Sequence, residues 1–104
     1  MAKSLGIFVT NPDQWQHVMG ITKAAKAKGS KVKVFFTWKS THNAKLPEFP
    51  ELCKLADDVS ICVDSYQKMG YDREDVPAGL DPTKLATQAQ HGMIIEDYDC
   101  YISL

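Results

Sequence analysis

Apolar runs alternate with an amphipathic stretch along the first third of the chain. Residues 4–10 are almost continuously apolar, which is typical of a strand covered on both faces. Residues 12–28 carry apolar positions at helical spacing, with Asn11 as a cap before the first turn and Gly29 after the last. Residues 31–38 return to the pattern of a buried strand. A strand, a helix and a second strand with short connections predict a βαβ unit with parallel strands.

A second strand-to-helix pattern lies in the middle of the chain. β-Branched residues over 59–63 predict a short buried strand. Asp64 and Ser65 are good helix N-caps and Gly70 is a natural helix end, so a short helix is expected at once. Cys62 then lies where a strand ends and a helix begins, the edge where ligands collect in open α/β sheets. Backbone N–H groups and the positive end of the helix favour a thiolate there, which makes Cys62 the candidate nucleophile.

The segments between these elements are polar or short. Residues 39–47 predict an irregular loop on the same sheet edge as Cys62. Residues 50–56 predict a short helix, and residues 71–76 predict one capped helical turn. Residues 100–104 predict a last strand.

The segment after residue 80 supports two interpretations. In the first, Asp81 begins a helix whose apolar residues recur at four-residue spacing. In the second, residues 83–87 form a fourth strand and the helix begins near Gln88. The pattern alone leaves both open.

Composition limits the class of protein. A chain of 104 residues with 44% hydrophobic and 24% charged residues predicts one globular domain. A net charge of −1 gives no indication of nucleic acid or an anionic membrane as partner. No apolar run has the length of a membrane span, and the first residues lack the apolar region of a signal peptide, so a cytoplasmic protein is expected.

The residues that carry redox or metal chemistry are few. Three cysteines at wide spacing favour free thiols in a reducing compartment over a disulfide framework. Cys53 is expected to be a small buried hydrophobe, and Cys100 a core residue or, if its strand neighbours that of Cys62, a relay thiol. No histidine or cysteine pair has metal-ligand spacing, and neither a G-x-G-x-x-G turn nor a P-loop is present, so no metal and no cofactor are expected.

The order of elements resembles the DsrE/DsrF-like family of small sulfur-handling proteins. Three segments carry the likeness: residues 5–13, residues 59–75 and residues 94–104. In sulfurtransferase members such as TusD-like and DsrE-like subunits, a cysteine after the third strand carries a persulfide, and Cys62 matches that position. Those subunits often continue with small alanines and an arginine-glycine pair, whereas this chain continues with residues 64–70, of different type.

The resemblance implies one DsrE-like domain over residues 1–104 with a three-layer, Rossmann-like or flavodoxin-like α/β fold. Its sheet is expected to be mainly parallel, with four or five strands and helices on both faces. The implied function is a cytoplasmic sulfur-relay protein, a persulfide carrier or sulfurtransferase. The different residues after Cys62 support an alternative, a non-catalytic DsrE-fold binding or assembly subunit that has lost the sulfur chemistry.

The expected site follows from these two lines of argument. Cys62 is the catalytic residue, and Asn11, His42, Asp64 and Ser65 line a pocket at the same sheet edge. Asn11 and its helix N-terminus can hold a small anion, whereas Asp64 would raise the thiol pKa if it lay close in space. The expected partners are a second copy of the chain and sulfur donor and acceptor proteins or small thiols. Trp38 and Tyr66 are expected at the contact between copies, because interfaces are enriched in these residue types.

Overall fold

The protein is described by a computed structural model over residues 4–86 and 100–104. Its elements, with η marking a 3-10 helix, are β1 (Ser4–Val9), η1 (Pro12–Gln14), α1 (Trp15–Ala27), β2 (Lys31–Phe36), η2 (Trp38–Lys45), α2 (Phe49–Leu55), β3 (Asp58–Cys62), α3 (Val63–Lys68), η3 (Pro82–Lys84), β4 (Leu85–Ala86) and β5 (Cys100–Ser103). The strands and helices predicted before residue 70 are all present. The first turn of the helix predicted over residues 12–28 is the 3-10 helix η1. The prediction that Asp64 or Ser65 caps the next helix is wrong, because the N-cap of α3 is Cys62 and the helix begins at Val63. The other ends differ from the expected ones by at most two residues.

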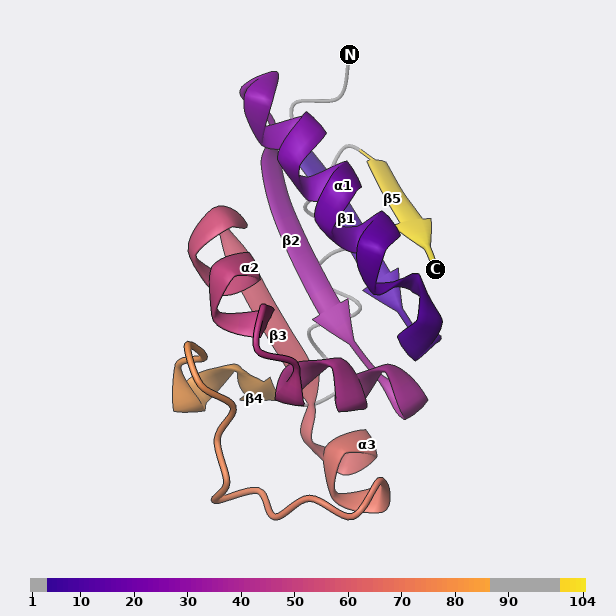
Figure 1. Cartoon of the computed structure of the whole chain (residues 1–104), viewed down its shortest axis with the longest axis vertical. Coiled ribbons are helices and arrows are strands. Elements are labelled where there is room, and N and C mark those ends of the chain that lie inside the picture. Colours follow the sequence, from indigo (N-terminus) through magenta and orange to yellow (C-terminus); the bar gives the residue numbers. More distant parts are fainter. Residues whose placement is uncertain (1–3, 87–99) are drawn as a thin grey trace.

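Five strands form one sheet in the order β4-β3-β2-β1-β5, and every pairing between described strands is parallel (Figure 1). The predicted βαβ unit is confirmed, since α1 connects β1 to its neighbour β2. The α/β class and the mainly parallel sheet are also confirmed. All carboxyl ends therefore meet at one edge of the sheet, where η1, η2 and α3 follow β1, β2 and β3.

One face of the sheet packs against α1 and α2, which lie on the same side in Figure 1. Alternate strand residues such as Ile7, Val34 and Ile61 point to this side and are fully buried. Trp15 of α1 lies against Phe36 and Phe49, with ring centroids 6.3 and 6.4 Å away. Burying a side chain of this size contributes about 2 kcal/mol, so this layer is the main source of stability.

The opposite face carries a smaller apolar cluster and an ion-pair network. Phe8, Phe35 and Cys62 form the cluster. Near the other end of β3, the Asp58 carboxylate lies 3.1 Å from Nζ of Lys33 and 2.9 Å from Nζ of Lys84. Because Lys84 directly precedes β4, this network fastens the short edge strand to β3. The helix predicted to begin near Gln88 lies outside the described residues.

The prediction of an irregular loop over residues 39–47 is wrong in one respect, because most of this segment forms the 3-10 helix η2. Hydroxyl groups stabilise its first turn. Oγ of Ser40 accepts from the Thr37 N–H at 3.1 Å and donates to the carbonyl oxygen of Val9, and Oγ1 of Thr41 donates to the Trp38 carbonyl at 2.9 Å. One of these bonds reaches β1, so η2 is tied to the sheet by a contact that no local pattern shows.

Two further predictions are decided by the structure. The helical turn predicted over residues 71–76 is absent, because the Asp72 carboxylate accepts from the Glu74 N–H at 2.9 Å and forms a turn instead. In the segment after residue 80, the strand interpretation is the better one. Asp81 caps only η3, and β4 follows at Leu85–Ala86 beside Ile61 and Cys62.

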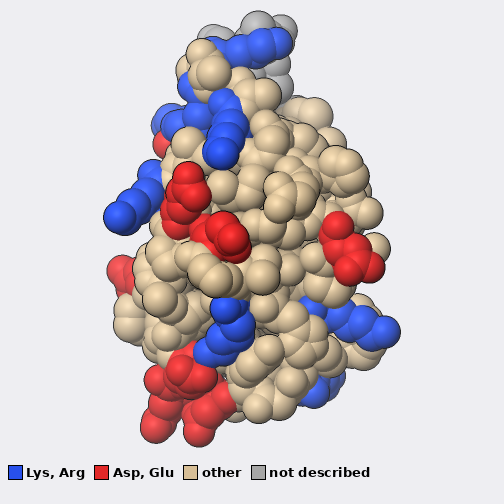
Figure 2. Space-filling view, in the orientation of Figure 1, with Lys and Arg blue, Asp and Glu red and all other residues tan. Residues whose placement is uncertain are grey.

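Lysine side chains gather at one end of the molecule, the upper end in Figure 2. Lys23, Lys28 and Lys31 are exposed there, around the end of α1 and the start of β2. Lys26 of the same group forms an ion pair with Asp57 at 2.9 Å. The cluster is a solvated helix end that complements the helix dipole.

Trp38 combines a strained backbone with an exposed side chain. Its φ of 57° lies in the left-handed region, and half of its surface is exposed. This backbone conformation is energetically unfavourable for a bulky residue, whereas glycine adopts it freely.

We expect Trp38→Gly to be more stable than Trp38→Ala by about 1 kcal/mol, because both variants lose the indole but only glycine relieves the left-handed backbone. Urea unfolding of the two variants measures the difference. Equal stability would show that residue 38 leaves the left-handed region at no cost once the indole is removed.

Candidate functional site

Cys62 is the last residue of β3, and α3 begins at the next residue. Its surface is 1% exposed, and its side chain packs with Phe8 and Phe35 on the face opposite α1 and α2. The strand-to-helix junction is therefore where the sequence predicts it. Attack on another sulfur needs an accessible thiolate. In this conformation the thiol lies below the surface.

Ser65 and Asp64 are neighbours on α3 with different environments. Ser65 is buried, and its Oγ lies 3.1 Å from Oγ1 of Thr37, which joins α3 to the end of β2. Asp64 is exposed and forms an ion pair with Lys68 at 3.0 Å. The carboxylate next to the thiol in sequence is therefore engaged at the surface by a lysine one helical turn later.

Asn11 follows β1 at the same edge of the sheet. Its Oδ1 accepts a hydrogen bond from the Asp13 N–H at 3.0 Å and caps η1. The residue is exposed. The predicted capping role is confirmed, and the side-chain oxygen is already used by it.

His42 lies on η2 and contacts Tyr71, which follows α3. Nδ1 of His42 is 2.7 Å from the Tyr71 hydroxyl, and the two rings meet edge to face. Tyr71 stacks on Tyr66 with ring centroids 4.9 Å apart, and Lys45 lies over both tyrosine rings. Tyr66 is fully buried, so the prediction that it contacts a second copy is wrong.

The five predicted site residues thus divide into separate groups at one sheet edge. Ser65 joins the end of β2, His42 joins the segment after α3, and Cys62 lies beneath in an apolar cluster. None of the five lines the hollow beside β3 or the cleft beside η2 that are described below. The group of Lys45, Tyr66, Tyr71 and Asp75 was not predicted from the sequence, because Lys45 is 30 residues away from Asp75 in the chain and no local motif joins them.

Cys100 is not a relay thiol for Cys62. It is exposed at the amino end of β5, beside Leu5, whereas Cys62 is at the carboxyl end of β3. The strands β2 and β1 lie between them. Three strand spacings of about 4.8 Å separate the two cysteines by at least roughly 14 Å, twice the reach of a disulfide. The expectation that Cys100 is a core residue is also wrong.

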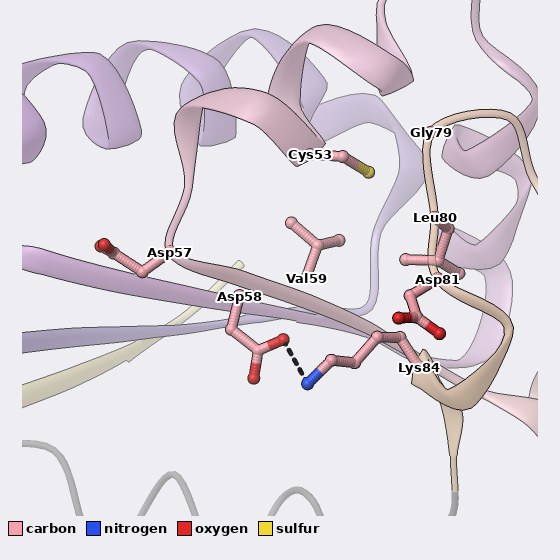
Figure 3. A pocket seen from close by; sticks show the side chains of 8 residues that line it. All are labelled: Cys53, Asp57, Asp58, Val59, Gly79, Leu80, Asp81 and Lys84. Carbon is pink, nitrogen blue, oxygen red and sulfur yellow. Dashed lines mark ion pairs between the residues drawn. The ribbon is translucent and has the colours of Figure 1, made fainter.

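A hollow of about 160 Å³ lies beside the first half of β3 and is closed by the segment before β4 (Figure 3). Three carboxylates line it, and all are engaged. Asp58 binds two lysines, Asp81 accepts from the Thr83 N–H, and Asp57 accepts from Lys26 and from the Val32 N–H at 2.6 Å. Partial burial raises the pKa of Asp57, but these hydrogen bonds outweigh it and hold the pKa below its usual value. The carboxylates of this hollow therefore hold neighbouring segments together and are not free to bind a ligand.

Cys53 of α2 also lines this hollow (Figure 3). Burial raises the pKa of its thiol from about 9.0 to about 11, because the thiolate loses hydration. Cys53 packs at the margin of the main core, which agrees in part with the prediction of a small buried hydrophobe.

We expect alkylation of Cys53 in the folded protein to increase with pH until about pH 11, because only the thiolate reacts. In urea the same rate should level off near the ordinary thiol pKa of about 8.5. Peptide mass spectrometry after timed iodoacetamide pulses measures both rates. A plateau near pH 8.5 in the folded protein would contradict the effect of burial.

Neither a metal-binding group nor a membrane-spanning helix is found in residues 4–86 and 100–104. Among them, no group of histidine, cysteine and acidic side chains is arranged to hold a metal ion. No helix in the same ranges has both the length and the apolar character needed to cross a membrane.

No family model matches the chain, and no curated protein matches its sequence. Among solved structures, the crystal structure of the ychN protein from E. coli is similar, with a TM-score of 0.71 over 100% of both chains at 9% sequence identity. That protein has a DsrE-like fold. At such low identity the likeness establishes the fold alone, and it supports the fold that the sequence resemblance implied.

Proposed function

We propose that this protein is a sulfur-relay protein of the DsrE-like kind in which Sγ of Cys62 carries the transferred sulfur. The observation that carries the proposal is the place of Cys62, at the strand-to-helix junction on the carboxyl edge of a sheet that matches a DsrE-like fold. The other described thiols are less suited. The pKa of Cys53 is raised to about 11, and Cys100 lies at the opposite edge.

The transfer requires no oxidant. The Cys62 thiolate attacks the outer sulfur of a donor persulfide, the donor's S–S bond breaks, and the donor leaves as a thiolate. A thiolate of the acceptor then attacks the outer sulfur on Cys62 and restores the Cys62 thiolate. The Ser60 hydroxyl is fully buried two residues before Cys62, on the same face of β3, and has no hydrogen-bond partner among the described residues.

The burial of Cys62 supports a second candidate, a DsrE-fold binding or assembly subunit without sulfur chemistry. With 1% of its surface exposed, Cys62 meets a donor only if the residues packed around it move. A buried structural cysteine needs no such movement. Assembly with a second copy of the chain stays a prediction for both candidates.

Incubation of the reduced protein with glutathione persulfide, followed by peptide mass spectrometry, distinguishes the two candidates. A sulfur carrier gains one sulfur atom on the Cys62 peptide, and Cys62→Ser abolishes that gain. Cys53→Ser and Cys100→Ser are the matched controls and should retain it. Modification of exposed Cys100 with none on Cys62 in the folded protein would overturn the carrier and favour the binding subunit. Reaction of Cys62 in urea confirms that its peptide is detected.

A further inference from the structure

A cleft of about 450 Å³ lies at the end of η2. One wall comes from the end of η2 and the start of α2, and the other wall comes from residues 75–78. In Figure 1 the segment after α3 runs below η2 and returns upward past it. Most of the wall is apolar and comes from Leu46, Pro47, Pro50, Val76 and Pro77. Three prolines restrict the backbone on both sides, so the wall loses little conformational entropy when it is covered. The volume is in the range of small-molecule sites.

Lys45 is the single lysine among the residues that line this cleft, and its ammonium group is held from several sides. Nζ of Lys45 lies 2.7 Å from a carboxylate oxygen of Asp75 and 5.4 and 5.1 Å from the ring centroids of Tyr66 and Tyr71. Burial lowers the pKa of Lys45, but hydrogen bonds to Asp75 and Tyr66 outweigh this and raise it. The group is therefore charged at neutral pH and fixed in position.

The carboxylate that pairs with Lys45 is easily replaced. The side chain of Asp75 is 63% exposed, and an exposed pair of this kind contributes about 1 kcal/mol or less. The backbone of Asp75 is held separately, since its carbonyl accepts a hydrogen bond from the Tyr66 hydroxyl at 2.5 Å. A carboxylate from outside can thus take the place of the Asp75 side chain without moving the wall.

We propose that this cleft binds a small carboxylic acid, with the carboxylate on Lys45 and an apolar ring or chain against the proline-rich wall. A fixed ammonium beside an apolar surface complements an anion with an apolar body. It does not complement the corresponding amide, which lacks the charge, or the amine, which repels Lys45. The inference does not depend on sulfur chemistry, because Cys62 does not line the cleft.

Titration of isotope-labelled protein with 3-phenylpropanoate, followed by amide chemical shifts in NMR spectra, tests the proposal. We expect saturable shifts around residues 44–47 and 75–78, and none with 3-phenylpropanamide or 3-phenylpropylamine at equal concentration. Lys45→Gln should weaken binding by about tenfold, the effect of losing one charge-assisted contact. Asp75→Asn should strengthen binding, because it removes the competing carboxylate.

Lys54→Gln is the matched control, because Lys54 is exposed on α2 outside the cleft and its loss changes the net charge equally. It should bind as the unchanged protein does. The amide spectrum of each variant reports whether the fold is retained. Equal binding of acid and amide, equal weakening by the two lysine variants, or no saturable shifts with the acid would each overturn the proposal.

Discussion

Asp58→Asn is expected to lower the free energy of unfolding by about 3 kcal/mol, because removing the charge from a largely buried ion pair is costly. The Asp58 carboxylate binds Lys33 and Lys84, and the side chain of Lys33 is only 6% exposed. Asparagine keeps the shape of the side chain and removes the charge. Urea unfolding of the variant and of the unchanged protein measures the loss.

Lys84→Gln separates the two halves of this network. Lys84 is 38% exposed, so its pair with Asp58 should contribute less than about 1 kcal/mol. The expected order is a large loss for Asp58→Asn and a small one for Lys84→Gln. Similar losses for both variants would show that the attachment of β4, and not the burial of Lys33, determines the effect.

Gly79→Ala is expected to cost about 3 kcal/mol, the sum of a left-handed backbone and an overpacked contact. Gly79 has a φ of +86°, and a Cβ placed on it would lie 2.7 Å from Cα of Pro50 and 2.9 Å from its Cβ. Neither atom belongs to a flexible side chain. The loop must therefore move away from α2, or Pro50 must shift.

Gly29→Ala is the control, since Gly29 has a similar φ of +82° and no atom within 4 Å of an added Cβ. It should cost only about 1 kcal/mol, the contribution of the backbone conformation. The difference between the two unfolding free energies then isolates the contact with Pro50. No difference would mean that the segment before η3 relaxes freely.

The first three strands and their helices could be predicted because their signals are local. The apolar run of β1, the cap at Asn11 and the glycine after α1 each act on neighbouring residues. The helix begins at the expected residue, with its first turn as the 3-10 helix η1, and β1 and β2 end within two residues of the expected ends. The position of Cys62 follows from the same kind of signal. These features depend on periodicity and capping within one segment.

The features that were missed depend on contacts between distant segments. The 3-10 helix η2 is tied down by the bond from Ser40 to the carbonyl of Val9 in β1, 31 residues away. The ion pair of Lys45 with Asp75 joins segments 30 residues apart. The burial of Cys62 depends on Phe8 and Phe35 from two other strands. A single sequence contains no signal for which of these side chains meet.

The three thiols of the chain lie in three separate environments. Cys53 borders the main core on one face of the sheet, Cys62 is buried on the other face, and Cys100 is exposed at the amino edge of β5. No cysteine of the same chain can therefore resolve a modified Cys62 by forming a disulfide with it. A sulfur atom carried by Cys62 in the proposed relay must therefore leave to a thiol of another molecule. The proposed relay thus uses one external thiol for each sulfur atom released, and the supply of that thiol governs the lifetime of the persulfide on Cys62.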